Sequence, residues 1–448
     1  MKKITAIIFS LIFCLSLALP TFAYQINDYE MHHEAGMVIY LDKHHGDMVI
    51  YEKNADQRMY PASITKLMTA LVMVDNIPDL ENTTITYTDS ANLRILGTGS
   101  VILNLQVGET LSAKDALASL VIMSCGDIAY AIAEYVGGTV EGFVEKMNQK
   151  AAELELADTH FVNPVGLHDD EHYSTARDLY KIATAAFANP VIKELCSTAR
   201  YTVPATNMSE ERYIQNTNML LNPNSDAYYR YAVGGKTGFT NEAGRCVLSL
   251  ASYNGYDYMA IVLKTTPYYN GRNDFKDVAN MFRWAFNNFE YKTVFEPNTP
   301  VTEAPIELAK DTDFLPICFE GGLETLLPTD ADASTLTYDL HLTQESFVAP
   351  VEKGTLVGTA DIYYAEKKIG TLNLVAGDTV KADFWLVLWD WLVKFVTSEF
   401  MLVVYCVLAV AVIGFVVWVI ILNSGKKKPR KVKYIPLSKE EREDFRNR

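Results

Sequence analysis

The stretch Pro61-Ala62-Ser63-Ile64-Thr65-Lys66-Leu67-Met68-Thr69-Ala70 is the most informative part of this chain. Pro61 suits a first helical position, and apolar residues recur at helical spacing from Leu67 onward. The pattern predicts a helix with Ser63 and Lys66 on one face, because side chains three positions apart are neighbours. A serine becomes a nucleophile when a neighbouring base takes its proton, and a neutral lysine can be that base. Taken alone, Ser63 is equally compatible with an ordinary helix cap.

Two further short motifs follow. Ser124-Cys125-Gly126 lies between two predicted helices, so its serine could relay a proton or simply end a helix. Lys236-Thr237-Gly238 is predicted on an edge strand, where Gly238 would let a substrate backbone approach closely. Lys236 and Thr237 offer a cation and a hydroxyl to a terminal carboxylate, and the alternative is a turn with an exposed lysine. The order of the three motifs favours a serine acyl-transfer site.

Both ends of the chain carry targeting or membrane signals. Residues 1–23 combine two lysines, an apolar run and a final alanine, which predicts a signal peptide cleaved after Ala23; an uncleaved anchor is the alternative. Residues 400–422 contain no charged residue and are long enough to cross a bilayer as a transmembrane helix. The basic tail at 423–448 predicts a single-pass protein of the cell membrane, with a cytoplasmic tail and an extracytoplasmic body.

Three tryptophans precede this apolar run. Residues 384–398 therefore suit the headgroup boundary as an interfacial juxtamembrane helix, or they mark an early start of the span. The chain has a net charge of −16 although its tail is basic, so the body is strongly acidic. An acidic body would be repelled by phosphates, so we expect no nucleic-acid partner.

The cysteines and histidines predict no disulfide framework and no metal or other cofactor. Cys125, Cys196, Cys246 and Cys318 are widely separated, and four free or buried thiols are favoured. A Cys125–Cys246 bridge is conceivable, but nothing in the sequence argues for it. The histidine pairs do not form a His-Glu-x-x-His site.

The body is expected to contain two domains. In residues 24–290 a strand pair comes first, helices follow, and apolar strands such as 246–252 and 258–263 come last; this order predicts an α+β domain with one central antiparallel sheet. Pro297–Pro305 is interpreted as a linker. Short β runs up to 381 predict a small all-β sandwich domain over residues 297–381.

The chain resembles the low-molecular-mass penicillin-binding proteins, which are serine-type D-alanyl-D-alanine carboxypeptidases. The three motifs are those of penicillin-binding proteins and class A β-lactamases. The resemblance also covers Asn163-Pro164-Val165-Gly166-Leu167-His168, the segment 172–178 and the small β domain, or about 30–380 in all. It implies a β-lactamase/transpeptidase-like catalytic domain.

The resemblance also implies roles for individual residues. Ser63 would form the acyl-enzyme, Lys66 would activate it and Ser124 would relay protons. Lys236 and Thr237 would hold the substrate carboxylate beside Gly238. The backbone N–H groups of Ser63 and Phe239 would form the oxyanion hole. The implied substrate is the D-Ala-D-Ala end of a peptidoglycan stem peptide, and β-lactam antibiotics would acylate the same serine.

The second motif departs from the family pattern, since Gly126 stands where an asparagine is expected. That side chain would be expected to hydrogen-bond Lys66 and a substrate amide. Asn218 is one candidate to fill the gap. The departure keeps open a catalytically weak or silent penicillin- or wall-binding module.

Related enzymes are a further alternative. A class A-like β-lactamase would need a Glu-x-x-x-Asn loop between the second and third motifs, and Glu153, Glu155 and Glu171 lack the asparagine. A D,D-endopeptidase or transpeptidase would use the same residues as the carboxypeptidase.

Overall fold

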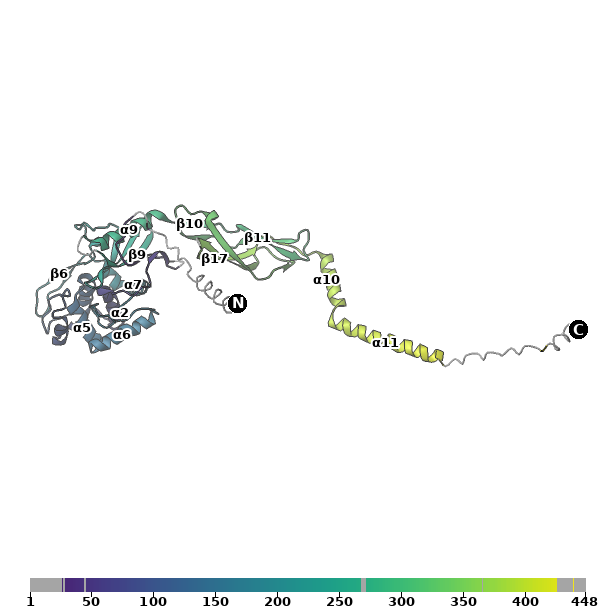
Figure 1. The fold of residues 1–448 in the computed structure, drawn as a ribbon, viewed down its shortest axis with the longest axis horizontal. Helices are drawn as coiled ribbons and strands as arrows, with labels where there is room; N and C mark the ends of the chain where they lie inside the picture. The colour runs from purple at the N-terminus through teal and green to yellow at the C-terminus, as the bar shows by residue number, and fades with distance from the viewer. Residues whose placement is uncertain are drawn as a thin grey trace, which may run out of the picture. The chain divides into compact units, whose positions relative to one another are not determined.

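Figure 1 shows a computed structural model of the protein, which describes residues 26, 29–43, 46–266, 271–364, 366–424 and 438. The predicted signal peptide and nearly all of the predicted cytoplasmic tail lie outside these residues. The chain divides into two compact units, Met1–Lys292 with Leu326–Ala331 and Thr293–Thr325 with Asp332–Arg448. Each unit is described by itself below.

The first unit is built on a five-stranded antiparallel sheet, as predicted. Its strand order is β2-β1-β9-β8-β7. Adjacent residues of a strand point to opposite faces, so Val247 joins one apolar core and Leu248 the other. Coverage on both faces explains why the last two strands read as nearly continuous apolar runs. The strands are β1 (Ala35–Tyr40), β2 (Met48–Lys53), β7 (Ala232–Thr240), β8 (Gly244–Tyr253) and β9 (Tyr256–Thr265).

Helices cover both faces of this sheet. The C-terminal helix of the unit, α9 (Asn273–Asn288), packs on one face, and α2 (Lys66–Asn76) lies within the helical cluster on the other (Figure 1). Helix α2 is buried along the whole stretch from Lys66 to Met73, as expected of a helix surrounded by others. The remaining helices are α2 (Lys66–Asn76), α3 (Asp89–Ile95), α4 (Ala113–Ala118), α5 (Gly126–Gly137), α6 (Val140–Glu153), α7 (Ala176–Ala188) and α8 (Pro190–Ser197).

Two helix predictions needed correction near the motifs. The helix expected from Pro61 begins as a short 3-10 turn, η1 (Ala62–Thr65), and becomes α-helical at Lys66. The first of the two helices predicted around Ser124-Cys125-Gly126 changes to a π-helical turn, η2 (Ser119–Met123), before Ser124. The spacing of apolar residues does not distinguish a 3-10 or a π-helical turn from a regular α-helix. Such turns are frequent at functional sites. The small elements are β3 (Thr84–Thr86), β4 (Thr110–Ser112), β5 (Arg200–Val203), β6 (Arg212–Gln215), and η3 (Met219–Leu221).

The second unit contains the predicted β-sandwich domain. Its strands follow the order β14-β16-β17-β12-β11-β15 and enclose one apolar core. The predicted linker at Pro297–Pro305 was wrong for most of its length, because Pro300–Glu307 forms strand β11 and pairs with β12. Pro300 opens the strand, where proline is tolerated, and Pro305 lies within it opposite Phe314, so these prolines did not mark a linker. The other strands are β12 (Phe314–Phe319), β14 (Leu336–Leu342), β15 (Phe347–Val348), β16 (Leu356–Tyr364) and β17 (Lys367–Ala376), with β10 (Phe289–Phe295) and β13 (Leu323–Pro328) at the division between the units.

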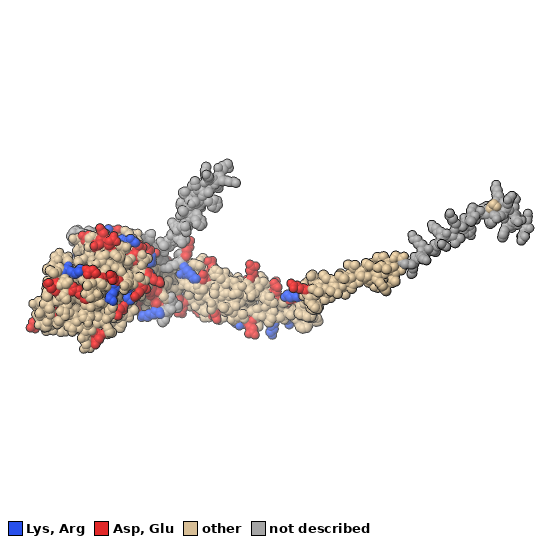
Figure 2. Space-filling view, turned by 90° about the horizontal axis from the view of Figure 1, so that it is seen from below, with Lys and Arg blue, Asp and Glu red and all other residues tan. Residues whose placement is uncertain are grey.

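Two apolar helices end the described chain. Helix α10 (Phe384–Val396) covers the predicted juxtamembrane segment, and α11 (Glu399–Ser424) is long and apolar enough to cross a membrane. Charged side chains are scattered over the first unit in Figure 2, whereas α11 beyond Glu399 has none.

Candidate active site

The first pair of the site is Ser63 and Lys66, brought together by the turn η1. The Lys66 Nζ lies 2.9 Å from the Ser63 Oγ, and Lys66 is completely buried at the start of α2. Ala62, just before the serine, has a positive φ of 47°. A non-glycine residue in this region stores backbone strain, a feature that clusters at active sites.

A backbone carbonyl completes the environment of Lys66. The Lys66 Nζ also donates to the Val165 carbonyl oxygen at 2.7 Å. The Asn163 side chain holds this turn, since its Oδ1 accepts from the backbone N–H groups of Val165, Gly166 and Leu167. Gly166 has a φ of +82°, and a Cβ there would lie 1.9 Å from the Ala62 carbonyl oxygen. The glycine therefore lets the Val165 turn touch the nucleophile turn.

Burial sets the protonation of Lys66. Desolvation lowers the pKa of Lys66 well below its usual range, and the charge of Lys236 lowers it further. A lysine that is neutral near neutral pH can accept the proton of an adjacent serine. The geometry and electrostatics of this pair thus suit a nucleophile and its base.

The second pair is Ser124 and Lys236. The residue Ser124 ends η2 in the left-handed conformation, and its Oγ lies 2.9 Å from the Lys236 Nζ. Burial lowers the pKa of Lys236 to about 8. Lys236 is thus mostly protonated at neutral pH, whereas burial and the charge of Lys236 both lower the pKa of Lys66 and favour its neutral form. The difference in pKa suits Lys66 to the part of a base and Lys236 to that of a cation.

The third motif lies on β7, which is an edge strand of the sheet as predicted. The Thr237 hydroxyl donates to the Thr217 hydroxyl at 2.6 Å. A Cβ at Gly238 would lie 2.8 Å from the Pro61 carbonyl oxygen and 3.0 Å from the Ser63 nitrogen. Gly238 therefore makes room for the nucleophile turn itself, which the sequence did not indicate. Phe239 follows, with nearly half of its surface exposed.

Gly126 begins α5, and Asn218 does not replace the expected asparagine. The Asn218 Nδ2 instead donates to the Gly234 carbonyl and the Ser249 hydroxyl in the sheet, so that candidate was wrong. A Cβ at Gly126 would lie 2.8 Å from the Ile95 Cδ1 and 2.9 Å from the Ser100 Oγ. The space beside the second motif is therefore filled by the segment that follows α3.

The cysteines of the described chain are free thiols, and the conceivable Cys125–Cys246 bridge is not formed. Burial raises the pKa of the Cys125 thiol far above its ordinary value. A buried thiol of this kind is inert, so Cys125 is a packing residue of the second motif. Within the described ranges, no group of three or more His, Cys, Asp and Glu side chains is placed to hold a metal ion.

Two supporting residues were missed as parts of the site. His172 is buried with its Nε2 2.8 Å from the Thr65 hydroxyl, and its Nδ1 accepts from the Val162 N–H. Burial lowers the pKa of His172 to about 4, so it is a neutral connector between η1 and the Val165 turn. Asp127 is buried beside Gly126 and accepts from the Leu103 N–H at 2.8 Å. The segments of these residues resembled the family, but their contacts are not visible in a sequence.

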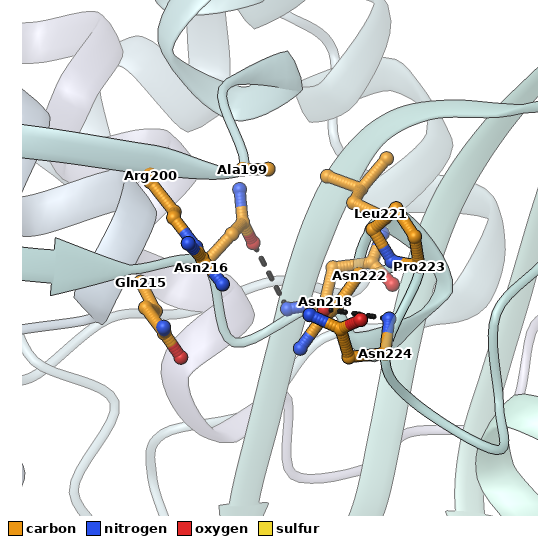
Figure 3. Close-up of a pocket in the computed structure, with 9 residues that line it drawn as sticks. All are labelled: Ala199, Arg200, Gln215, Asn216, Asn218, Leu221, Asn222, Pro223 and Asn224. Carbon is orange, nitrogen blue, oxygen red and sulfur yellow. Dashed lines mark hydrogen bonds between the residues drawn. The ribbon is translucent and has the colours of Figure 1, made fainter.

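A cavity of about 240 Å³ opens where β5, β6 and η3 meet (Figure 3). Thr217, which accepts the hydrogen bond from Thr237, stands in the chain between two residues that line this cavity. Thr217 therefore links the motif to two residues of the cavity wall, while neither Lys236 nor Thr237 lines the cavity itself. Its polar lining consists of one guanidinium and five amides: Arg200, Gln215, Asn216, Asn218, Asn222 and Asn224.

Comparisons with known proteins agree with this arrangement. The family described as "D-alanyl-D-alanine carboxypeptidase" matches residues 24–266, and "Penicillin-binding protein 5, C-terminal domain" matches residues 289–382. D-alanyl-D-alanine carboxypeptidase DacF of Bacillus subtilis is 29% identical over 80% of this chain and 90% of its own length. A D-alanyl-D-alanine endopeptidase of Pseudomonas aeruginosa is 32% identical over 56% of this chain and 76% of its own length.

A solved structure shows the same fold. The D-alanyl-D-alanine carboxypeptidase DacD from Francisella tularensis superposes with a TM-score of 0.63, covering 82% of this chain and 98% of that protein. Its sequence identity is 24%, so this likeness bears on the architecture of the two units.

Proposed function

Because the chain belongs to the D-alanyl-D-alanine carboxypeptidase family, we propose that it removes the terminal D-Ala from peptidoglycan stem pentapeptides. The observation that carries this proposal is the pair of separated Ser–Lys contacts, Lys66 with Ser63 and Lys236 with Ser124. Burial lowers the pKa of Lys66 and favours its neutral form, which suits a base, while Lys236, with a pKa of about 8, is mostly charged near neutral pH and suits a carboxylate-binding cation.

The proposed reaction has two halves. Neutral Lys66 accepts the Ser63 proton while the Oγ attacks the carbonyl carbon of the penultimate D-Ala. The N–H groups of Ser63 and Phe239 stabilise the oxyanion, while Lys236 and Thr237 hold the terminal carboxylate. As the peptide C–N bond breaks, the leaving amine receives a proton through Ser124. Water then hydrolyses the Ser63 ester and releases the shortened peptide; a β-lactam would form the same ester.

We further propose that α11 anchors the protein in the cell membrane by a single span. Its length and lack of charge after Glu399 support a span, and the basic residues of 423–448 support a cytoplasmic tail. The catalytic unit would then lie on the extracytoplasmic face, where stem peptides are exposed.

The first expected result is D-alanine release from diacetyl-Lys-D-Ala-D-Ala by the full chain in detergent. Turnover should vanish in Ser63→Ala, and penicillin should label the wild type but not the variant. Covalent labelling by penicillin without any D-alanine release would contradict the enzyme proposal and favour the silent binding module.

A second candidate activity is hydrolysis of substrates with a larger leaving residue, as in a D,D-endopeptidase. Its support is the cavity lined by the two chain neighbours of Thr217, because Thr217 accepts a hydrogen bond from Thr237, the residue proposed to hold the substrate carboxylate. The polar lining suits peptide groups, since a primary amide both donates and accepts. The relative from Pseudomonas aeruginosa carries the endopeptidase name.

The endopeptidase candidate can be tested by removing the charge of Arg200, which lines the cavity. We expect Arg200→Ala to lower kcat/KM for a D-Glu leaving residue about threefold relative to a D-Ala leaving residue, as for the loss of an exposed ion pair. Lys193→Ala removes an exposed charge on the nearby α8 and should leave the ratio unchanged. If the ratio of kcat/KM for the D-Glu substrate to kcat/KM for the D-Ala substrate were the same in the wild type and in Arg200→Ala, the cavity would not bind the leaving residue.

A further inference from the structure

The side chains of Ile95 and Ser100 crowd the place where a Cβ at position 126 would stand. A Cβ on Gly126 would lie 2.8 Å from the Ile95 Cδ1, 2.9 Å from the Ser100 Oγ and 3.0 Å from the Ser100 Cβ. Real Cβ atoms essentially never approach other heavy atoms closer than 3.0 Å. The glycine is thus matched to the end of α3 and to the segment that follows it.

Hydrogen bonds to α5 fix the position of this segment. The Gly126 N–H donates to the Val101 carbonyl at 2.7 Å, and the Leu103 N–H donates to the buried Asp127 carboxylate at 2.8 Å. The first two residues of α5 therefore hold the backbone on the C-terminal side of Ser100. On its N-terminal side, the Thr98 hydroxyl donates to the Ile95 carbonyl at 2.9 Å.

The two expected roles of the asparagine can be considered separately. Toward Lys66, the Val165 carbonyl already accepts from the Nζ at 2.7 Å. The contact to a substrate amide is the role left without a side chain at position 126. In an asparagine the carboxamide O and N lie about 2.4 Å from their own Cβ, by standard bond lengths. The Ser100 Oγ stands at a similar distance, 2.9 Å, from the same point.

We propose that the Ser100 hydroxyl takes over the substrate-binding part of this missing carboxamide and hydrogen-bonds the amide on the acyl side of the substrate. Ser100 is partly exposed, so its hydroxyl can meet a ligand. A hydroxyl both donates and accepts, as a carboxamide does. This inference rests on the proposed acyl transfer at Ser63.

Two penicillins separate this role from a structural one. Benzylpenicillin carries an acylamino side chain, the equivalent of the substrate amide, whereas aminopenicillanic acid has only a free amine. In the full chain we expect Ser100→Ala to slow acylation by benzylpenicillin about tenfold, as for the loss of one hydrogen bond, and acylation by aminopenicillanic acid less than twofold. Ser90→Ala removes an exposed hydroxyl from the preceding α3, leaves the hydrogen bond from the Ser100 N–H to the Thr98 hydroxyl in place, and should not discriminate between the two compounds. An equal loss with both compounds, or no loss, would overturn the role of Ser100.

A second experiment restores the asparagine of the family pattern at position 126. We expect Gly126→Asn alone to slow acylation by both penicillins, because the new side chain collides with Ser100 and Ile95. Combined with Ser100→Gly, which removes one obstacle, Gly126→Asn should restore benzylpenicillin acylation relative to Ser100→Gly alone. Faster acylation in Gly126→Asn alone would contradict the proposal. A wild type unreactive toward both penicillins would instead refute the proposed function, and the inference with it.

Discussion

Lys66→Met is expected to slow acylation of Ser63 by benzylpenicillin about 10²- to 10⁴-fold, the usual contribution of a positioned base. Methionine keeps an unbranched side chain in the buried position but cannot accept a proton. The pocket was already arranged for an uncharged group, because desolvation lowers the pKa of Lys66 well below its usual range. The variant should therefore fold, but it loses the hydrogen bond to the Val165 carbonyl, so its free energy of unfolding should fall by about 1–3 kcal/mol. Stopped-flow acylation and thermal unfolding together measure the two effects.

The pH profile of the wild type tests the same assignment. Protonated Lys66 cannot accept the Ser63 proton, so kcat/KM should rise with pH as this lysine becomes neutral. It should fall again above about pH 8, where Lys236 loses the charge that holds the carboxylate. Lys66→Met should lose the rising limb and keep the falling one. Near-normal acylation by this variant would assign the base to another group.

The sequence contained the chemically distinctive side chains but not the backbone groups around them. Ser63 and Lys66 were predictable as neighbours because their spacing of three is set by local helical geometry. Lys236 and Ser124 are separated by 112 positions and still lie 2.9 Å apart, and only the resemblance indicated their proximity. The Val165 carbonyl could not be anticipated, since every residue carries a carbonyl and its direction depends on the turn.

Gly126 shows why a missing side chain is hard to interpret from sequence. The substitution suggested a gap, and Asn218 was a reasonable candidate by residue type alone. The structure instead closes the space with Ser100, a residue of no evident motif, because the chain after α3 bonds to the start of α5. The edge position of β7 was predictable from its glycines, whereas the approach of Gly238 to Pro61 depends on tertiary packing.

Gly166→Ala is expected to be the most damaging conservative substitution in the site. Its Cβ would lie 1.9 Å from the Ala62 carbonyl oxygen, a rigid backbone atom that cannot rotate away. The Val165 turn and the nucleophile turn must then separate, which breaks the Lys66–Val165 hydrogen bond. We expect a loss of roughly 3–5 kcal/mol in the free energy of unfolding, in the range of severe single substitutions, and penicillin acylation below detection. Chemical denaturation and labelling with fluorescent penicillin measure both.

Gly255→Ala is the matched control. It imposes the cost of an alanine at positive φ without any collision between the new Cβ and a neighbouring atom. Gly255 has a φ of +85°, close to the +82° of Gly166, but a Cβ there would meet no atom within 4 Å. The left-handed conformation alone costs an alanine about 1–2 kcal/mol, so this variant should lose that amount of stability and keep full acylation. If the two variants behaved alike, the close contact between the turns would contribute nothing. A selective loss in Gly166→Ala would show that two backbone turns, held together across a glycine, set the position of the proposed base.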